Sequence, residues 1–139
     1  MSIESTVANN SGNIDESERK FLESEKAIAE LLKAEGQTVK ALPETSSGGR
    51  NADAEADGIR TEFKSIQPGS TSATVKNQIN NSIRRGGQAR NIIIDARGSD
   101  LTLAEANRGL DRAKNISRGK IDRVRIIGDD YDISSTEFN

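Results

Sequence analysis

The pattern of apolar and polar positions along the chain predicts helices and strands in a mixed order. Residues 1–13 are mostly polar, and we interpret them as a flexible leader. Asp15 with Glu18 three residues later is typical of a helix start, and Gly36 is typical of a helix end. The pattern between them predicts a helix over residues 15–35, whose apolar positions are Phe21, Leu22, Ile28, Ala29 and Leu32.

A short strand at residues 38–42 and a turn-rich loop at residues 43–50 lead into a predicted hairpin. The dipeptide Asp57-Gly58 at its centre favours a type I′ turn, in which both central residues have positive φ. We therefore expect the residues on either side of this dipeptide to pair as two antiparallel strands.

The hairpin register brings three charged side chains together. Counting outward from the turn places Ala56 opposite Ile59 and Asp53 opposite Glu62. Side chains alternate between the two faces of a strand, so Lys64 lies on the face of Glu62 and diagonal to Asp53. Like charges directly opposite each other destabilise a sheet unless a cation lies between them, so this patch is a candidate site.

The second half of the chain alternates strands with helices. Residues 90–97 contain three consecutive isoleucines, which suits a strand buried on both faces, and Thr102 with Glu105 forms a capping box. The predicted elements are a helix at 73–85, a strand at 90–97, a helix after Thr102 with its buried face at Leu103, Ala106, Leu110 and Ala113, a strand at 121–127 and an edge strand at 131–133. Together they predict a single α/β domain over residues 14–139, with a mixed central sheet and helices on its faces.

The composition restricts the chemistry open to the chain. The sequence has no histidine and no cysteine, which excludes histidine general bases, Ser-His-Asp triads, disulfides and zinc sites built from histidine or thiolate. Catalysis is left to carboxylates, lysine, arginine, tyrosine and hydroxyl groups. The sequence has no apolar run of the length that a bilayer-spanning helix needs, and it gives no indication of a homo-oligomer.

The net charge of −2 is unevenly distributed along the chain. Residues 1–57 carry 12 acidic and 6 basic side chains, residues 58–128 carry 14 basic and 6 acidic ones, and residues 129–139 carry 4 acidic ones. A basic stretch of this size predicts a surface for a polyanion. The alternative is that its charges lie on solvated helix faces.

Glu25 has an unusual place in the first predicted helix. It lies within one turn of Phe21, Leu22, Ile28 and Ala29, and therefore in the middle of the apolar stripe. A carboxylate at such a position either reaches water at the edge of the stripe or points into a site beneath the helix.

Asp53 and Glu62 supply oxygen ligands, which suit Mg²⁺ or Mn²⁺ better than Zn²⁺. During cleavage of a phosphodiester, such an ion neutralises the phosphate and activates a water molecule. Lys64 would then stabilise the negative charge that develops around phosphorus. The alternative is an ordinary exposed hairpin pair that Arg60 or Lys64 bridges.

These residues resemble a known signature. Asp53 followed by Glu62-Phe63-Lys64 on the returning strand is similar to the Asp…(Asp/Glu)-x-Lys motif of the PD-(D/E)XK nuclease superfamily, although Ala52 stands where that motif often has proline. The predicted order of elements also resembles the core of that superfamily. The resemblance implies that Glu25 corresponds to the additional metal-binding glutamate that many members carry on the first helix.

A second resemblance covers most of the chain. The runs Asp57–Ile66, Ala73–Asn77 and Gln88–Arg97 are similar to C-terminal toxin domains of contact-dependent growth inhibition proteins, particularly those that cleave tRNA. Val7-Ala8-Asn9-Asn10 resembles the Val-Glu-Asn-Asn marker that precedes such domains. The resemblance implies a tRNA nuclease carried at the tip of a large exported cell-surface protein. Such a toxin acts in the cytoplasm of the target bacterium and is neutralised by a cognate immunity protein.

Several residues remain candidates for the edge of this site. The resemblance implies Lys76 and Asp95, while Lys76 as a solvated helix charge and Asp95 as a partner of Arg97 are the simpler interpretations. The arginines that we expect to contact phosphate are Arg84, Arg90 and Arg97.

Three functions stay open from the sequence. The first is a metal-dependent endoribonuclease in which Asp53, Glu62 and Glu25 bind the ion and Lys64 assists. The second is a metal-independent ribonuclease that uses the RNA 2′-hydroxyl as nucleophile. The third is a non-enzymatic binding module in which the carboxylates are structural.

Overall fold

The computed structural model describes residues 12–43, 54–84, 89–117 and 119–138. Within these residues, seven strands form one sheet in the order β1-β2-β3-β4-β5-β6-β7. The strands are β1 (Asn13–Asp15), β2 (Thr38–Ala41), β3 (Ala54–Ala56), β4 (Ile59–Ser65), β5 (Asn91–Asp95), β6 (Arg123–Ile127) and β7 (Asp132–Ser135). The helices are α2 (Glu23–Ala34), α3 (Ser72–Arg84) and α4 (Leu103–Ser117). The predicted α/β class with a mixed sheet is confirmed.

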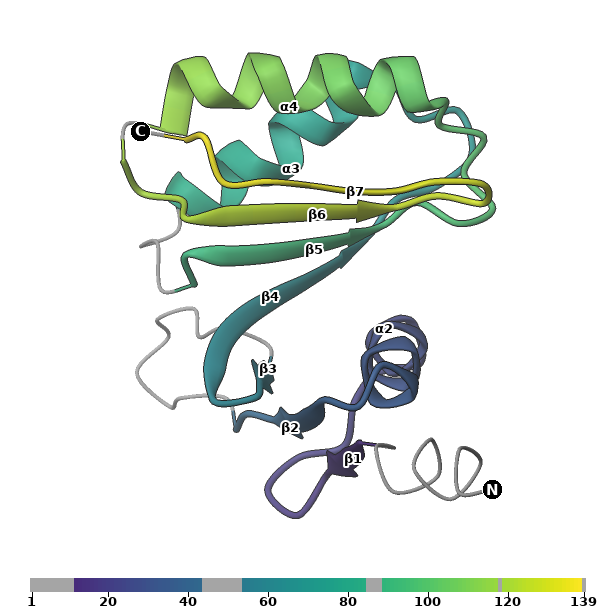
Figure 1. Ribbon diagram of the computed structural model, residues 1–139, viewed down its shortest axis with the longest axis vertical. Coiled ribbons are helices and arrows are strands. Elements are labelled where there is room, and N and C mark those ends of the chain that lie inside the picture. The colour runs from purple at the N-terminus through teal and green to yellow at the C-terminus, as the bar shows by residue number, and fades with distance from the viewer. Residues whose placement is uncertain (1–11, 44–53, 85–88, 118, 139) are drawn as a thin grey trace, which may run out of the picture.

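The helices lie on two sides of the sheet (Figure 1). Helices α3 and α4 pack together over β5 and β6, in a core that includes Val75, Ile94 and Ile126. Helix α2 packs beside β1–β4, in a separate core that includes Ile28 and Phe63. Since neighbouring residues of a strand point to opposite faces, β5 and β6 contribute alternate side chains to the two cores.

Parallel and antiparallel pairs both occur in the sheet. Strands β1–β2, β4–β5 and β5–β6 pair in parallel, whereas β2–β3, β3–β4 and β6–β7 pair antiparallel. The parallel pairs β4–β5 and β5–β6 are each connected through a helix, as βαβ units require. The edge strand expected at residues 131–133 is present as β7.

The predicted hairpin register is confirmed for its described residues. Asp57 and Gly58 have φ values of 50° and 83°, as a type I′ turn demands. Ala56 lies opposite Ile59, and the register continues to the pair of Ala54 with Thr61. Asp53, the next residue outward, lies outside the described residues.

Asp57 also ties the hairpin to β2. Its carboxylate accepts a hydrogen bond of 2.8 Å from the backbone amide of Thr38, and its own amide donates to the Thr38 carbonyl at 2.8 Å. Asp57→Ala is expected to reduce the free energy of unfolding by about 1–2 kcal/mol, because it removes the acceptor and strains a positive φ. Urea denaturation measures this effect. Asp57→Asn, which retains an acceptor and tolerates positive φ, is the control and should change stability by less than about 0.5 kcal/mol.

The first helix begins later than the sequence predicts. Residues Asn13–Asp15 form β1, and the Asp15 carboxylate accepts a hydrogen bond of 2.9 Å from the amide of Ser17 in a local turn. Helix α2 starts at Glu23, where Glu25 accepts a hydrogen bond of 2.9 Å from the amide of Leu22. The prediction of a helix start at Asp15 is wrong, because aspartate caps turns as readily as helices.

Helix α4 confirms the predicted cap and corrects the predicted face. The amide of Glu105 donates to the Thr102 hydroxyl at 3.2 Å. Leu103, expected on the buried face, is 46% exposed. Within the described part of this helix, the buried residues are Ala106, Gly109, Leu110, Ala113 and Ser117. The inward stripe therefore includes a glycine that hydrophobicity alone does not reveal.

Gly109 lies where α4 packs closely against α3. A Cβ at this position would lie 2.5 Å from the Val75 Cβ and 3.1 Å from the Ser72 carbonyl oxygen. Gly109→Ala should therefore destabilise the fold by about 1–2 kcal/mol, although alanine favours helices by about 1 kcal/mol. Thermal unfolding checks the sign. Asn107→Ala, an exposed position on the same helix, is the control and should be neutral or slightly stabilising.

Candidate active site

Glu62 and Lys64 form an ion pair on β4. The Lys64 Nζ lies 2.9 Å from the Glu62 Oε2, and the two side chains are only 13% and 15% exposed. A charged pair this sheltered from water interacts more strongly than a surface pair. The period-two arrangement predicted from the sequence therefore holds for these two residues.

The orientation of the pair is set by the apolar residues beside it. Phe63, between the two, points to the α2 side, where its ring stacks on Phe21 with centroids 5.9 Å apart. Glu62 and Lys64 consequently point to the opposite face of β4. Their neighbours on β5 in register are Ile92 and Ile94, which belong to the core beneath α3 and α4.

Strand β4 extends beyond the described part of β3. The described pairing of β3 ends at Ala54 with Thr61, whereas β4 continues to Ser65. Asp53 lies outside the described residues, so its place opposite Glu62 stays a prediction from the register. Arg60 is exposed and, two residues before Glu62, shares its face of the strand.

Glu25 belongs to a different layer. It is 8% exposed, and its Oε1 accepts hydrogen bonds from the amide of Leu22 at 2.9 Å and from Arg19 Nη1 at 3.1 Å. These contacts explain a carboxylate within the apolar stripe, because it closes the first turn of α2 and pairs with an arginine. Helix α2 covers the face of Phe63, so the structure does not bring Glu25 to the face of Glu62.

The donors for a metal ion are therefore few in the described part of the chain. Among these residues, no group of three or more Asp, Glu, His or Cys side chains is arranged to hold an ion. The carboxylate of Glu62 has the chemistry that Mg²⁺ or Mn²⁺ prefers. A metal site at Glu62 thus depends on the predicted contribution of Asp53.

Asp95 and Arg97 pair with each other at the end of β5. The Asp95 Oδ1 accepts hydrogen bonds of 2.8 Å from Arg97 Nε and 3.1 Å from the Arg97 amide, and Arg97 Nη2 also donates to the Ala27 carbonyl of α2. The hydrogen bond to Asp95 raises the pKa of Arg97. Asp95 is in register with Ile127, which belongs to the α2-side core, so this pair also lies away from the face of Glu62.

The other basic residues predicted to contact the substrate lie in different surroundings. Lys76 is half-buried on α3, in the layer that covers the face of Glu62 and Lys64. Arg84 is the last residue of α3, and its side chain is outside the description. Arg90 donates to both carboxylate oxygens of Asp122, at 3.1 and 3.0 Å, and to the Gly119 carbonyl, so it connects the starts of β5 and β6.

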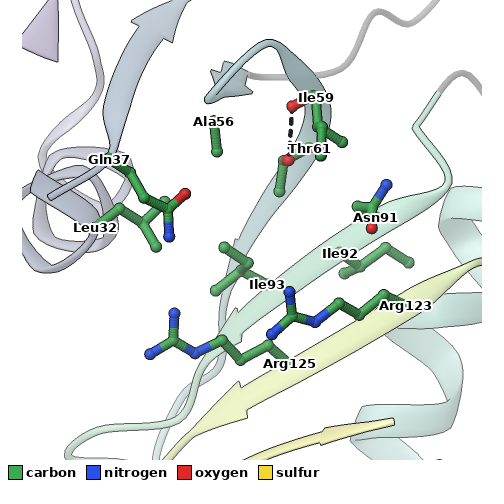
Figure 2. A pocket seen from close by; sticks show the side chains of 10 residues that line it. All are labelled: Leu32, Gln37, Ala56, Ile59, Thr61, Asn91, Ile92, Ile93, Arg123 and Arg125. Carbon is green, nitrogen blue, oxygen red and sulfur yellow. Dashed lines mark hydrogen bonds between the residues drawn. The ribbon is translucent and has the colours of Figure 1, made fainter. Parts of the chain in front are cut away.

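Two further arginines on β6 were missed from the sequence. Arg123 and Arg125 line a hollow on the α2 side of the sheet, together with Gln37 and Asn91 (Figure 2). Arg125 is 9% exposed and donates to Glu35 and Asp132. Its signal in the sequence is a charge between the apolar residues Val124 and Ile126, at a position that period-two alternation assigns to the same face as Arg123.

These features define an α/β domain with a sheltered Glu-x-Lys pair on an internal strand of a mixed sheet. Residues 50–133 match the family described as the contact-dependent growth inhibition CdiA C-terminal domain. The match spans more than half of the chain and includes both members of the pair, and the chain therefore belongs to this family. Neither the curated proteins nor the solved structures that were compared contain a match.

Membership identifies the chain as a toxin domain of contact-dependent growth inhibition, the C-terminal part of a large cell-surface protein. Domains of this family are generally nucleases and usually pair with immunity proteins. Among the described residues, no helix combines the length and the apolar composition needed to cross a membrane.

Proposed function

We propose that this domain is a metal-dependent endoribonuclease that cleaves tRNA in the cytoplasm of competing bacteria. The observation that carries the proposal is the sheltered pair of Glu62 and Lys64, 2.9 Å apart on β4. A carboxylate and an amine at this spacing suit phosphodiester hydrolysis, because one can hold a cation and the other can stabilise developing negative charge.

The roles follow from the charges. Asp53 and Glu62 would hold Mg²⁺ or Mn²⁺, which when bound neutralises the phosphate and lowers the pKa of a coordinated water. Lys64 would orient that water or stabilise the additional charge on the phosphate. Glu25 would not bind the ion directly, because its carboxylate accepts hydrogen bonds from Arg19 and from the amide of Leu22. Its contribution would be to hold the first turn of α2 in place.

The RNA backbone would be held by basic residues near this face. Lys76 on α3 and the exposed Arg60 are the favoured contacts, with Arg84 at the end of α3. Arg90 and Arg97 are weaker candidates because they already pair with Asp122 and Asp95. A cognate immunity protein that covers this surface is expected to present acidic side chains to it.

The test is incubation of total bacterial RNA with the purified chain, with Mg²⁺ or Mn²⁺ and then with a chelator. The proposal expects tRNA to be cut and the chelator to stop cleavage. Products that end in a 2′,3′-cyclic phosphate and form despite the chelator would indicate the metal-independent ribonuclease instead. Intact RNA under every condition would favour a non-enzymatic binding module.

A further inference from the structure

A hollow lies on the α2 side of the sheet, near the last turn of α2 (Figure 2). Three of its polar residues form one row across neighbouring strands, because Thr61 pairs with Asn91 and Asn91 pairs with Arg123. Gln37 faces this row from the segment after α2. The side chains of Glu62 and Lys64 point to the other face of the sheet, so the hollow is separate from the candidate active site.

The polar groups of the hollow retain capacity for a ligand. Within the described residues, the carboxamides of Gln37 and Asn91 make no side-chain hydrogen bond, and both residues are only partly buried. The Thr61 hydroxyl donates to the Ile59 carbonyl at 2.9 Å and can still accept. Two amides that each donate and accept are the groups that proteins use to bind the edges of nucleobases.

The two arginines of the hollow differ in how closely carboxylates pair with them. Arg125 donates to Glu35 and to Asp132, so its charge is neutralised by two carboxylates. Arg123 is exposed and donates a hydrogen bond of 3.2 Å to the hydroxyl of Ser134, and it interacts with Asp132 only through space, without a salt bridge among the described residues. The hollow therefore suits a ligand with one anionic group and an uncharged polar body.

The rest of the lining is aliphatic and the space is small. Leu32, Ala56 and Ile93 are buried and form apolar walls. The hollow measures about 90 Å³ and opens to solvent. A closed cavity of about 150 Å³ accommodates benzene, so this hollow has room for part of one ring and none for a dinucleotide cofactor.

We propose that this hollow binds one nucleotide of the RNA substrate away from the bond that is cut. One edge of the base would enter the hollow between Gln37 and Asn91, against the aliphatic walls, while the rest of the base stays outside it and the phosphate lies at Arg123. This inference rests on the proposed function, because it takes RNA as the substrate. Arg60, exposed at the start of β4, provides positive charge on the face of Glu62 and Lys64.

The experiment measures binding without cleavage. The Glu62→Gln protein is titrated with each of the four nucleoside monophosphates, with inorganic phosphate and with a hexaglutamate peptide, while NMR follows the side-chain amides of Gln37 and Asn91. At least one nucleotide should shift both signals in a saturable manner. Adding Arg123→Gln should weaken this binding about tenfold or more, since a charge-assisted contact is lost. Arg108→Gln, an exposed position on α4, is the matched control and should leave it unchanged.

Three results would overturn the inference, and a fourth would contradict the proposed function. Inorganic phosphate that shifts the signals as strongly as any nucleotide would indicate an anion at Arg123 without base recognition. Saturation by hexaglutamate with no response to nucleotides would indicate a surface for an acidic protein. Cleavage that persists although no nucleotide binds would overturn this inference alone, whereas nucleotide binding by a chain that never cuts RNA would contradict the proposed function.

Discussion

Glu62→Gln is expected to reduce tRNA cleavage by the purified chain at least about a hundredfold. Glutamine retains the size of glutamate but has no charge, so it binds a hard cation much more weakly and cannot form the ion pair that Glu62 forms with Lys64 at 2.9 Å. The rate of loss of full-length tRNA on a gel, in Mg²⁺ or Mn²⁺, measures the effect.

The matched control for this variant is Glu30→Gln. Glu30 is an exposed residue of α2, and the same change of charge there should leave the rate within about twofold of wild type. Circular dichroism must show both variants folded before the rates are compared. A Glu62→Gln protein that is folded and cuts tRNA at the wild-type rate would remove Glu62 from the active site.

The elements governed by local chemistry could be predicted from the sequence. The Asp57-Gly58 dipeptide determined the type of turn, and this turn fixed the register of β3 with β4. From that register, period-two alternation was enough to place Glu62 and Lys64 on one face. A prediction of this kind succeeds because every step involves residues close together in the sequence.

The predictions that failed concern features that depend on residues far away in the sequence. Asp15 has the pattern of a helix cap, yet residues 13–15 pair with β2, and the pairing partners are more than twenty residues away. The sequence was enough to place Glu25 in the apolar stripe of its helix. It was not enough to predict which face of the sheet α2 covers, because that depends on the layer order of the whole domain. The pairing of Glu25 with Arg19 could have been predicted from the sequence, because Arg19 lies just before α2 and Glu25 lies in the first turn of the same helix.

Arg125 illustrates the same limit at the level of single side chains. Its partners, Glu35 at the end of α2 and Asp132 at the start of β7, lie on opposite sides of it in the sequence. The charge in an apolar strand indicated that partners must exist, because an unpaired buried charge is costly. Only the arrangement of α2 against β6 and β7 identifies them.

Arg125→Met is expected to lower the free energy of unfolding by about 2 kcal/mol. The guanidinium donates at 2.8 Å to Glu35 and at 2.9 and 2.6 Å to Asp132, and methionine of similar length keeps the packing while it removes every one of these bonds. The loss stays below that of a fully buried pair, because the Glu35 and Asp132 side chains are 37% and 47% exposed and regain water. Urea denaturation at pH 7 measures it.

The pH dependence of the same variant separates the ion pair from packing. The hydrogen bonds from Arg125 lower the pKa of Asp132 below its ordinary value of 3.8, so this stabilisation is complete above about pH 4 and is lost as the pH falls through the folded-state pKa. The difference in stability between wild type and Arg125→Met should therefore narrow as the pH is lowered from 7 towards 3. Arg108→Met, the same change at an exposed position on α4, is the control and should change stability by less than about 0.5 kcal/mol at either pH. A difference that stays constant across this range would assign the effect of Arg125 to packing of its aliphatic stem, and would leave the carboxylates of Glu35 and Asp132 without an energetic role in joining α2 to the sheet.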